Sequence, residues 1–236
     1  MKPVIVTPRA QAFAPHAHRA FTIAELNALL ASPVYTKREC QVKTWGDVAF
    51  WLPLLGLYTG ARLRELCRLQ LSDLREPEGL WCLRIHEQAR DDEAASLAGI
   101  RHVPLHSHLL QCGLPAYVAG ERTARGSGLL FAQLATGRSD YRAIAFSRWF
   151  SRYVRQELGF GERPLTFCSF RHTFAAFAGG TPRGNAHIAI LGGTPATRRG
   201  RHAGGKERPT LAQLVEVMQQ LVYPELAIGH LERTLP

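Results

Sequence analysis

Two arginines in separate segments are the residues of this sequence best suited to chemistry. Arg62 lies in TGARLREL, and Arg171 lies in FRHTF, far along the chain. A guanidinium group presents a planar fork of N–H donors that binds two phosphate oxygens at once. If the two forks converge, they hold the non-bridging oxygens of a phosphodiester and stabilise negative charge that develops there. Convergence of the pair would therefore create a phosphate-binding site, whereas each arginine taken alone is equally well explained as a surface salt-bridge partner.

A helix is expected to position Arg62. Leu63, Leu66, Cys67 and Leu71 recur at the spacing of one helical face directly after it. A glutamate, Glu65, follows Arg62 by three positions and is expected to orient its guanidinium, because residues i and i+3 are neighbours on a helix surface.

The remaining pattern predicts a mainly α fold with a small antiparallel β-sheet (α+β). Capping boxes at Thr22–Glu25 and Thr210–Gln213 open the first and last helices. The expected helices cover 21–32, 47–58, 109–118, 141–158, 169–177 and 210–221, and the expected strands cover 81–86 and 101–105. In helix 141–158 the inward-facing residues are expected to be Ile144, Trp149, Tyr153 and Val154.

The chain divides into an arm or linker over 1–20 and one domain over 21–236. Residues 1–20 carry prolines and no periodicity, and the segment 179–209 is rich in glycine and arginine. That segment is expected to be a flexible loop, with a short helix over 185–191 as the alternative.

The composition favours a basic, soluble, cytoplasmic protein. The net charge is +10 and 25 of the 29 basic residues are arginine, which favours a polyanionic partner; the alternative is a GC-rich genome that uses arginine in place of lysine. The sequence has no apolar run long enough to span a membrane, and its five scattered cysteines form no disulfide or zinc pattern. The histidines of RHVPLHSH are poor candidates for metal ligands, so no metal or other cofactor is expected.

Several segments resemble the tyrosine recombinase, or phage integrase, family. The segment LLGLYTGARLRELCRLQLSDL resembles its first arginine box, RPLTFCSFRHTFAAF its second, and RHVPLHSHLL the joint between them. FTIAELNALL is similar to the family's opening helix and LVYPEL to a C-terminal feature of one subgroup. The similarity covers 21–226. It implies a catalytic-domain fold, double-stranded DNA as the partner, and DNA recombination or integration by phosphodiester transesterification.

The resemblance also implies two limits. The family's N-terminal core-binding domain is not part of this sequence, so we expect a half-clamp on DNA with modest, salt-dependent affinity. Family positions for a hairpin lysine, a histidine, a histidine or tryptophan, and the tyrosine nucleophile hold other residues here, and these are Ala95, Cys168, Gly193 and His202. Without the lysine the leaving oxygen lacks its general acid. A catalytically impaired, degenerate site is therefore expected.

The candidate site residues fall into two sets. The catalytic candidates are Arg62, Glu65, Cys168, Arg171, His172 and His202. The DNA-binding candidates are Arg62, Arg64, Arg101, Arg148, Arg171, Arg198, Arg199 and Arg201.

Three hypotheses follow. The first is a DNA-binding but impaired integrase, either a regulator or a remnant of a mobile genetic element. The second is an active recombinase whose nucleophile comes in trans, from another copy or from a full-length recombinase contacted through the C-terminal region. The third is a protein-interaction module that does not bind DNA.

Overall fold

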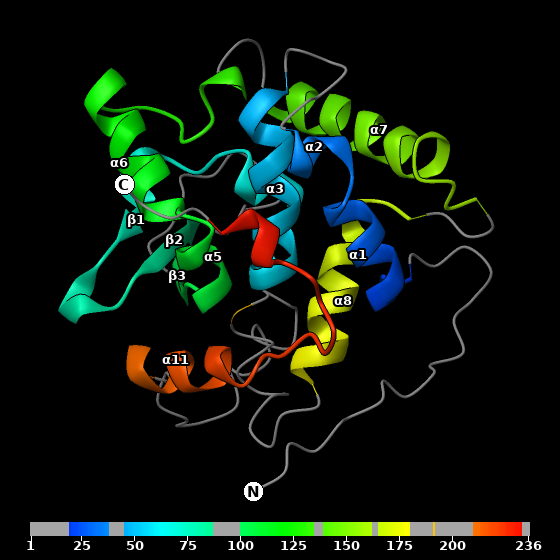
Figure 1. Cartoon of the computed structure of the whole chain (residues 1–236). Coiled ribbons are helices and arrows are strands. Elements are labelled where there is room, and N and C mark those ends of the chain that lie inside the picture. The colour runs from blue at the N-terminus through cyan, green and yellow to red at the C-terminus, as the bar shows by residue number, and fades with distance from the viewer. Residues whose placement is uncertain are drawn as a thin grey trace, which may run out of the picture.

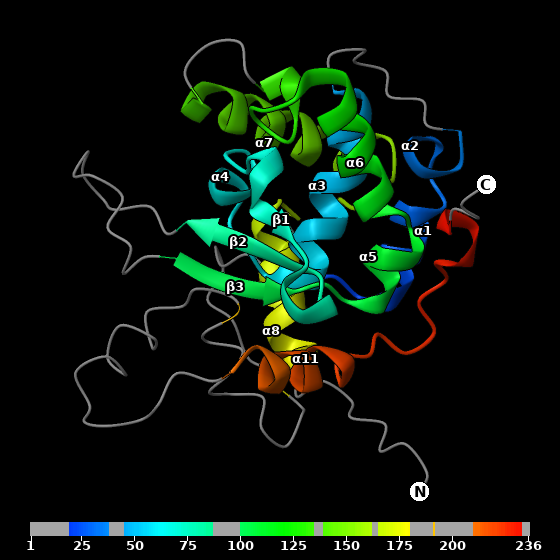
Figure 2. The same ribbon diagram turned by 90° about the vertical axis from the view of Figure 1, so that its left-hand side faces the viewer.

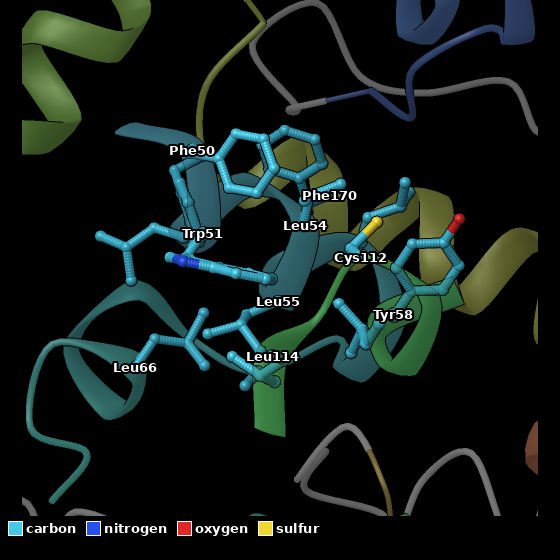
Figure 3. Packing of buried hydrophobic residues seen from close by; sticks show 14 of the residues in the cluster. Phe50, Trp51, Leu54, Leu55, Tyr58, Leu66, Cys112, Leu114 and Phe170 are labelled. Carbon is cyan, nitrogen blue, oxygen red and sulfur yellow. The ribbon is translucent and has the colours of Figure 1, made fainter. Parts of the chain in front are cut away.

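One apolar helix forms the centre of the protein. In a computed structural model, which describes residues 19–37, 45–86, 100–134, 139–161, 165–179, 191 and 210–232, helix α3 (Gly46–Thr59) is buried at every position from Val48 to Thr59. Its wholly apolar surface explains this position, because such a helix must be covered on all sides. Figure 3 shows Trp51, Leu55 and Tyr58 of α3 among the buried side chains around it.

Other helices surround α3, as Figure 1 shows. They are α1 (Ile23–Leu30), α2 (Pro33–Thr36), α4 (Leu63–Leu66), α5 (Ser107–Gln111), α6 (Leu114–Arg125), α7 (Ser139–Gln156), α8 (Cys168–Ala178) and α11 (Leu211–Gln219). Short 3-10 turns lie at Leu71–Asp73 (η1), Pro77–Gly79 (η2), Ala132–Leu134 (η4) and Gly229–Leu231 (η5). No helix in these described parts of the chain is long and apolar enough to cross a membrane.

A three-stranded antiparallel sheet lies at one side of the molecule, away from α1 and α2 (Figures 1 and 2). Its strands are β1 (Leu74–Arg75), β2 (Cys82–His86) and β3 (Ile100–Pro104), in the order β1-β2-β3. Helix α11 packs against β3. The expected fold class, mainly α with a small antiparallel sheet, is therefore confirmed.

Helix α8 packs on the segment just before α1 through an aromatic contact, and on the end of α3 through close backbone approach. The ring of Phe170 stacks on Phe21 at a centroid distance of 4.7 Å, and the Phe21 N–H donates to Thr173 Oγ1 at 2.8 Å. At the end of α3, Gly60 adopts φ +61, and a Cβ there would lie 2.5 Å from Cδ1 of Phe174. Glycine is required at this position both for its left-handed conformation and for the contact with α8.

The last described residues, Leu221–Leu231, form what we call the C-terminal strap, which lies across the helices of the same chain. The Tyr223 hydroxyl donates to the Leu57 carbonyl at 2.6 Å. The side chain of Asn27 donates to the Glu225 carbonyl at 2.9 Å and accepts from the Ala227 N–H at 2.8 Å. These bonds attach the strap to α1 and α3.

Local sequence signals were reliable guides to these elements. Both predicted capping boxes, Thr22 with Glu25 and Thr210 with Gln213, are present. The predicted helices at 47–58, 141–158 and 169–177 and the two predicted strands are confirmed within one to three residues at their ends.

Three details of the prediction were wrong. The helix after Arg62 ends at Leu66, because Gln70 forms a bridge to Leu129 that draws the chain out of the helix. The segment 109–118 lies in two helices, which are separated at Gly113 with φ +81. Ile144 is 40 % exposed rather than inward-facing. The expectations for 1–18, for the hairpin loop 87–99 and for the segment 179–209, apart from Gly179 and Leu191, lie outside the described residues.

Candidate phosphate-binding site

Arg62 lies at the N-cap of α4, with its side chain directed partly to solvent. Its extended backbone (φ −73, ψ 147) lets its N–H donate to Glu65 Oε2 at 2.8 Å, while its Nη1 lies 3.2 Å from Glu65 Oε1. The Glu65 side chain is 1 % exposed and that of Arg62 is 51 % exposed. One edge of the guanidinium therefore contacts a buried acid, and the remainder is accessible to a ligand.

Arg101 of β3 binds the same carboxylate from the interior. Its Nη2 and Nη1 donate to the two oxygens of Glu65 at 2.7 and 3.2 Å, and its Nε donates to the Leu191 carbonyl at 2.9 Å. Burial alone would raise the pKa of Glu65, but the hydrogen bonds and charge of Arg101, with the N–H and charge of Arg62, lower it overall. Glu65 is therefore an ionised, fully engaged acid.

Arg171 approaches from α8. Its Nη1 donates at 2.9 Å to the carbonyl of Gly60, two residues before Arg62. Burial lowers the pKa of Arg171, and the positive charges of Arg62 and Arg101 lower it further, although Glu65 opposes this. This mutual repulsion arises because the groups are close together. Arg62 and Arg101 thus bind the carboxylate of Glu65, Arg171 lies within its electrostatic influence, and the excess positive charge favours an anion.

Cys168 and His172 lie one turn apart on α8, on either side of Arg171 in sequence. The Sγ of Cys168 is 3.8 Å from Nε2 of His172, and Cys168 is exposed. A thiol is a weak donor and a weak acceptor, so Cys168 offers a phosphate little compared with an imidazole at the same position.

The other predicted DNA-binding residues lie in different places. Arg64 is exposed on α4, and Arg148 is exposed on α7, where it lines a cavity of about 250 Å³ with Trp45 and Trp149. The predicted residues that lie outside the described parts of the chain are Arg198, Arg199, Arg201 and His202.

Arg101 differs from its expected environment. DNA contact was expected, but its side chain is only 6 % exposed and its nitrogens bind Glu65 and Leu191. The signal was present in the sequence, because Arg101 shares the inward face of β3 with Val103, two positions later. Arg101 therefore positions Glu65, which in turn orients Arg62.

The histidines of RHVPLHSH are not grouped for metal binding. His106 and His108 pack with Tyr58, whose hydroxyl lies 2.7 Å from His108 Nδ1, while His102 is on the exposed face of β3. Across the described residues, no group of histidine, cysteine, aspartate or glutamate side chains could hold a metal ion.

Comparison of the sequence with protein-family models and with curated proteins gives no match. The structure is similar to XerH site-specific recombinase bound to its difH substrate before cleavage, with a TM-score of 0.54 and 16% identity over 79% of this chain and 50% of that chain. The post-cleavage complex of XerH with palindromic difH gives a TM-score of 0.52 and 16% identity over 78% and 48%. The chain thus spans about half the length of these recombinase chains, and it has a fold like that of the tyrosine recombinases.

Proposed function

We propose that this protein binds double-stranded DNA by gripping a backbone phosphate between Arg62 and Arg171, and that its capacity to cleave the strand is impaired. In this proposal residues 1–20 form an arm and residues 21–236 form a recombinase catalytic-domain-like unit.

The observation that carries the proposal is that Arg62 and Arg101 bind the carboxylate of Glu65, while Arg171 bonds to the Gly60 carbonyl two residues before Arg62. Glu65 neutralises only part of the arginines' positive charge, and Arg101 already occupies both of its oxygens. Arg62 is half-exposed beside it, so its remaining N–H donors are available to a phosphate oxygen. The fold is similar to that of a recombinase bound to its DNA substrate, which makes a DNA phosphate a suitable ligand for this arrangement.

The impairment is proposed from the residue types at the family's catalytic positions. By the motif resemblance, Cys168 stands where the family has a histidine, and Ala95, Gly193 and His202 stand where it has the lysine, the histidine or tryptophan, and the tyrosine. Loss of a single proton-transfer group costs about 10² to 10⁴ in rate, so loss of several with the nucleophile should leave no measurable strand exchange.

A salt series tests the DNA-binding part. Binding of a labelled duplex should weaken steeply as salt rises, and the Arg62→Ala and Arg171→Ala variants should each lower the slope of log K against log [salt] by about 1. Arg155→Ala, at an exposed position of α7, is the matched control and should leave binding nearly unchanged. Salt-independent binding, or a double variant that binds like the original protein, would contradict the phosphate grip.

Covalent trapping tests the impairment. A duplex nicked close to the cleavage position retains any protein that attacks the phosphate, and we expect no adduct. An adduct that disappears in His202→Phe would show an active nucleophile. If an adduct formed only on mixing with a complete recombinase, the nucleophile would come in trans and the second hypothesis would replace this one.

A further inference from the structure

The outer face of the sheet carries a second group of basic side chains. Leu83 and Ile85 of β2 are completely buried against the core, so the alternate residues Arg84 and His86 lie on the opposite face. Arg84 is the direct cross-strand partner of His102. We use the name outer sheet face for four residues, Arg75, Arg84, His86 and His102.

A buried aspartate holds part of this group in place. Asp73, at the end of η1, has a side chain with no exposed surface and accepts from Arg84 Nε at 2.9 Å and from the Gln70 N–H at 2.8 Å. His86 Nε2 lies 3.2 Å from the same Asp73 oxygen that binds Arg84. Arg84 is therefore held in place through its Nε.

Within the described residues, the terminal nitrogens of Arg75 and Arg84 remain unpaired. Arg75 is also held through Nε, which donates to the Ser72 carbonyl at 3.1 Å. Two anchored guanidinium groups on one face supply the kind of donors that bind a phosphate group.

The charges on this face repel one another. Burial lowers the pKa of His102, and the positive charges of Arg84 and Arg75 lower it further. Asp73, the buried acid beneath the face, is occupied by its own contacts. The other acids on neighbouring elements are Glu76 and Glu78, after β1, and Glu216 of α11, and the pKa of His102 is set mainly by burial and by the two arginines. An anion bound between these groups would remove the repulsion.

We propose that the outer sheet face binds a phosphate group, at a site separate from Arg62 and Arg171. The sheet itself separates the two sites, because Arg101 and Val103 of β3 point inward toward Glu65 and the core while His102 points outward. Binding at this face does not require the Arg62–Arg171 grip.

The wild-type protein allows a direct test. The pKa of His102, followed by NMR through its ring C–H signal, should rise when inorganic phosphate is added, because the bound anion favours the charged imidazole. His106, buried in the Tyr58 cluster, serves as the internal reference and should not shift. If the pKa of His102 is the same with and without phosphate, the proposal is wrong.

Variants locate the site. Arg75 is exposed and, unlike Arg84, has no bond to Asp73. Arg75→Gln should therefore weaken phosphate binding, measured through the pKa of His102, about threefold or more, which is the size expected for a surface charge contact. Arg62→Ala should leave this binding intact. The opposite pattern, in which Arg62→Ala abolishes it and Arg75→Gln does not, would assign the phosphate effect to the first site and overturn the proposal.

Two further titrations distinguish the source of the phosphate. If duplex DNA raises the pKa of His102 at a far lower phosphate concentration than a mononucleotide does, the ligand is a nucleic-acid backbone. Arg75→Gln should then lower the slope of log K against log [salt] for DNA binding by about 1. Equal effects of mononucleotide and duplex, with an unchanged slope, would identify a small phosphate compound at the same site. If the Arg62 and Arg171 variants bound DNA like the original protein, the two titrations of His102 would still show whether phosphate binds to the outer sheet face.

Discussion

The carboxylate of Glu65 accepts hydrogen bonds from both terminal nitrogens of Arg101, at 2.7 and 3.2 Å, and both side chains are buried. The acid that orients Arg62 is therefore itself held from the interior of the protein. A surface ion pair would contribute little and would move freely, whereas this buried two-point contact fixes the position of Glu65.

Replacing Arg101 should destabilise the fold. Arg101→Ala leaves Glu65 ionised and buried with only Arg62 and a backbone N–H as partners, and breaking such a pair costs about 3 kcal/mol or more. Urea unfolding would measure the loss. Arg101→Lys retains the charge but not the fork, so it should recover only part of the stability.

The DNA-binding readout of these variants separates positioning from contact. Because Arg101 is buried, Arg101→Lys should weaken binding through disorder of Arg62 with little change in the salt slope. A fall in slope by about 1, equal to that of Arg62→Ala, would instead indicate that Arg101 itself contacts phosphate.

Gly60 links the helix junction to Arg171. Gly60→Ala forces a Cβ to within 2.5 Å of Phe174 at a backbone φ of +61, so we expect a loss of about 2 kcal/mol or more in the free energy of unfolding. Since Arg171 bonds to the Gly60 carbonyl, DNA affinity should fall as well.

Gly120→Ala provides the matched control. Gly120 lies within α6 and has open space around the added Cβ, so the same change should stabilise the protein by about 0.5 to 1 kcal/mol. Equal effects of the two substitutions would argue against the close contact between Gly60 and Phe174.

His106 should make stability depend on pH. Its Nδ1 accepts from the His108 N–H and its Nε2 donates to the Leu221 carbonyl, so the neutral ring fits the site. Burial lowers the pKa of His106 from 6.5 to about 4. The unfolded chain then binds the proton more readily, and stability present above pH 6.5 is lost as the pH falls toward 4, by roughly 3 kcal/mol at about 1.4 kcal/mol per pH unit.

The thermal midpoint measured across this range checks the prediction. His106→Gln keeps a donor toward the Leu221 carbonyl but cannot take up a proton, so its stability should vary less with pH. His108 and Glu65 also have lowered pKa values and add losses in the same direction, which the variant retains. An unaltered pH profile in His106→Gln would exclude His106 as the cause.

Local features of the fold could be predicted, and long-range ones could not. The capping box of Thr22 and Glu25 involves neighbours in sequence, so its residues alone determine it. The early end of α4 depends on the bridge between Gln70 and Leu129, which no local pattern reveals. The family resemblance indicated Arg62 and Arg171. The contact between Arg101 and Glu65 joins residues far apart in the chain, so it could be found only from the structure.

The C-terminal strap should contribute measurably to stability through Tyr223. Its hydroxyl donates to the Leu57 carbonyl inside the core, so Tyr223→Phe should cost about 1 kcal/mol and leave the carbonyl without this partner. Tyr141→Phe, at a position that is 68 % exposed, is the control and should change the unfolding free energy by less than about 0.5 kcal/mol.

Asn27 connects the first described helix with the strap through two bonds from one side chain, to the Glu225 carbonyl and from the Ala227 N–H. A chain terminus usually frays and exchanges its amide protons rapidly. Here the Ala227 amide can exchange with deuterium only when its bond to α1 opens, so its protection should match that of amides in α1 and should fall sharply in Asn27→Ala. The two ends of the described chain would then unfold together as one cooperative unit.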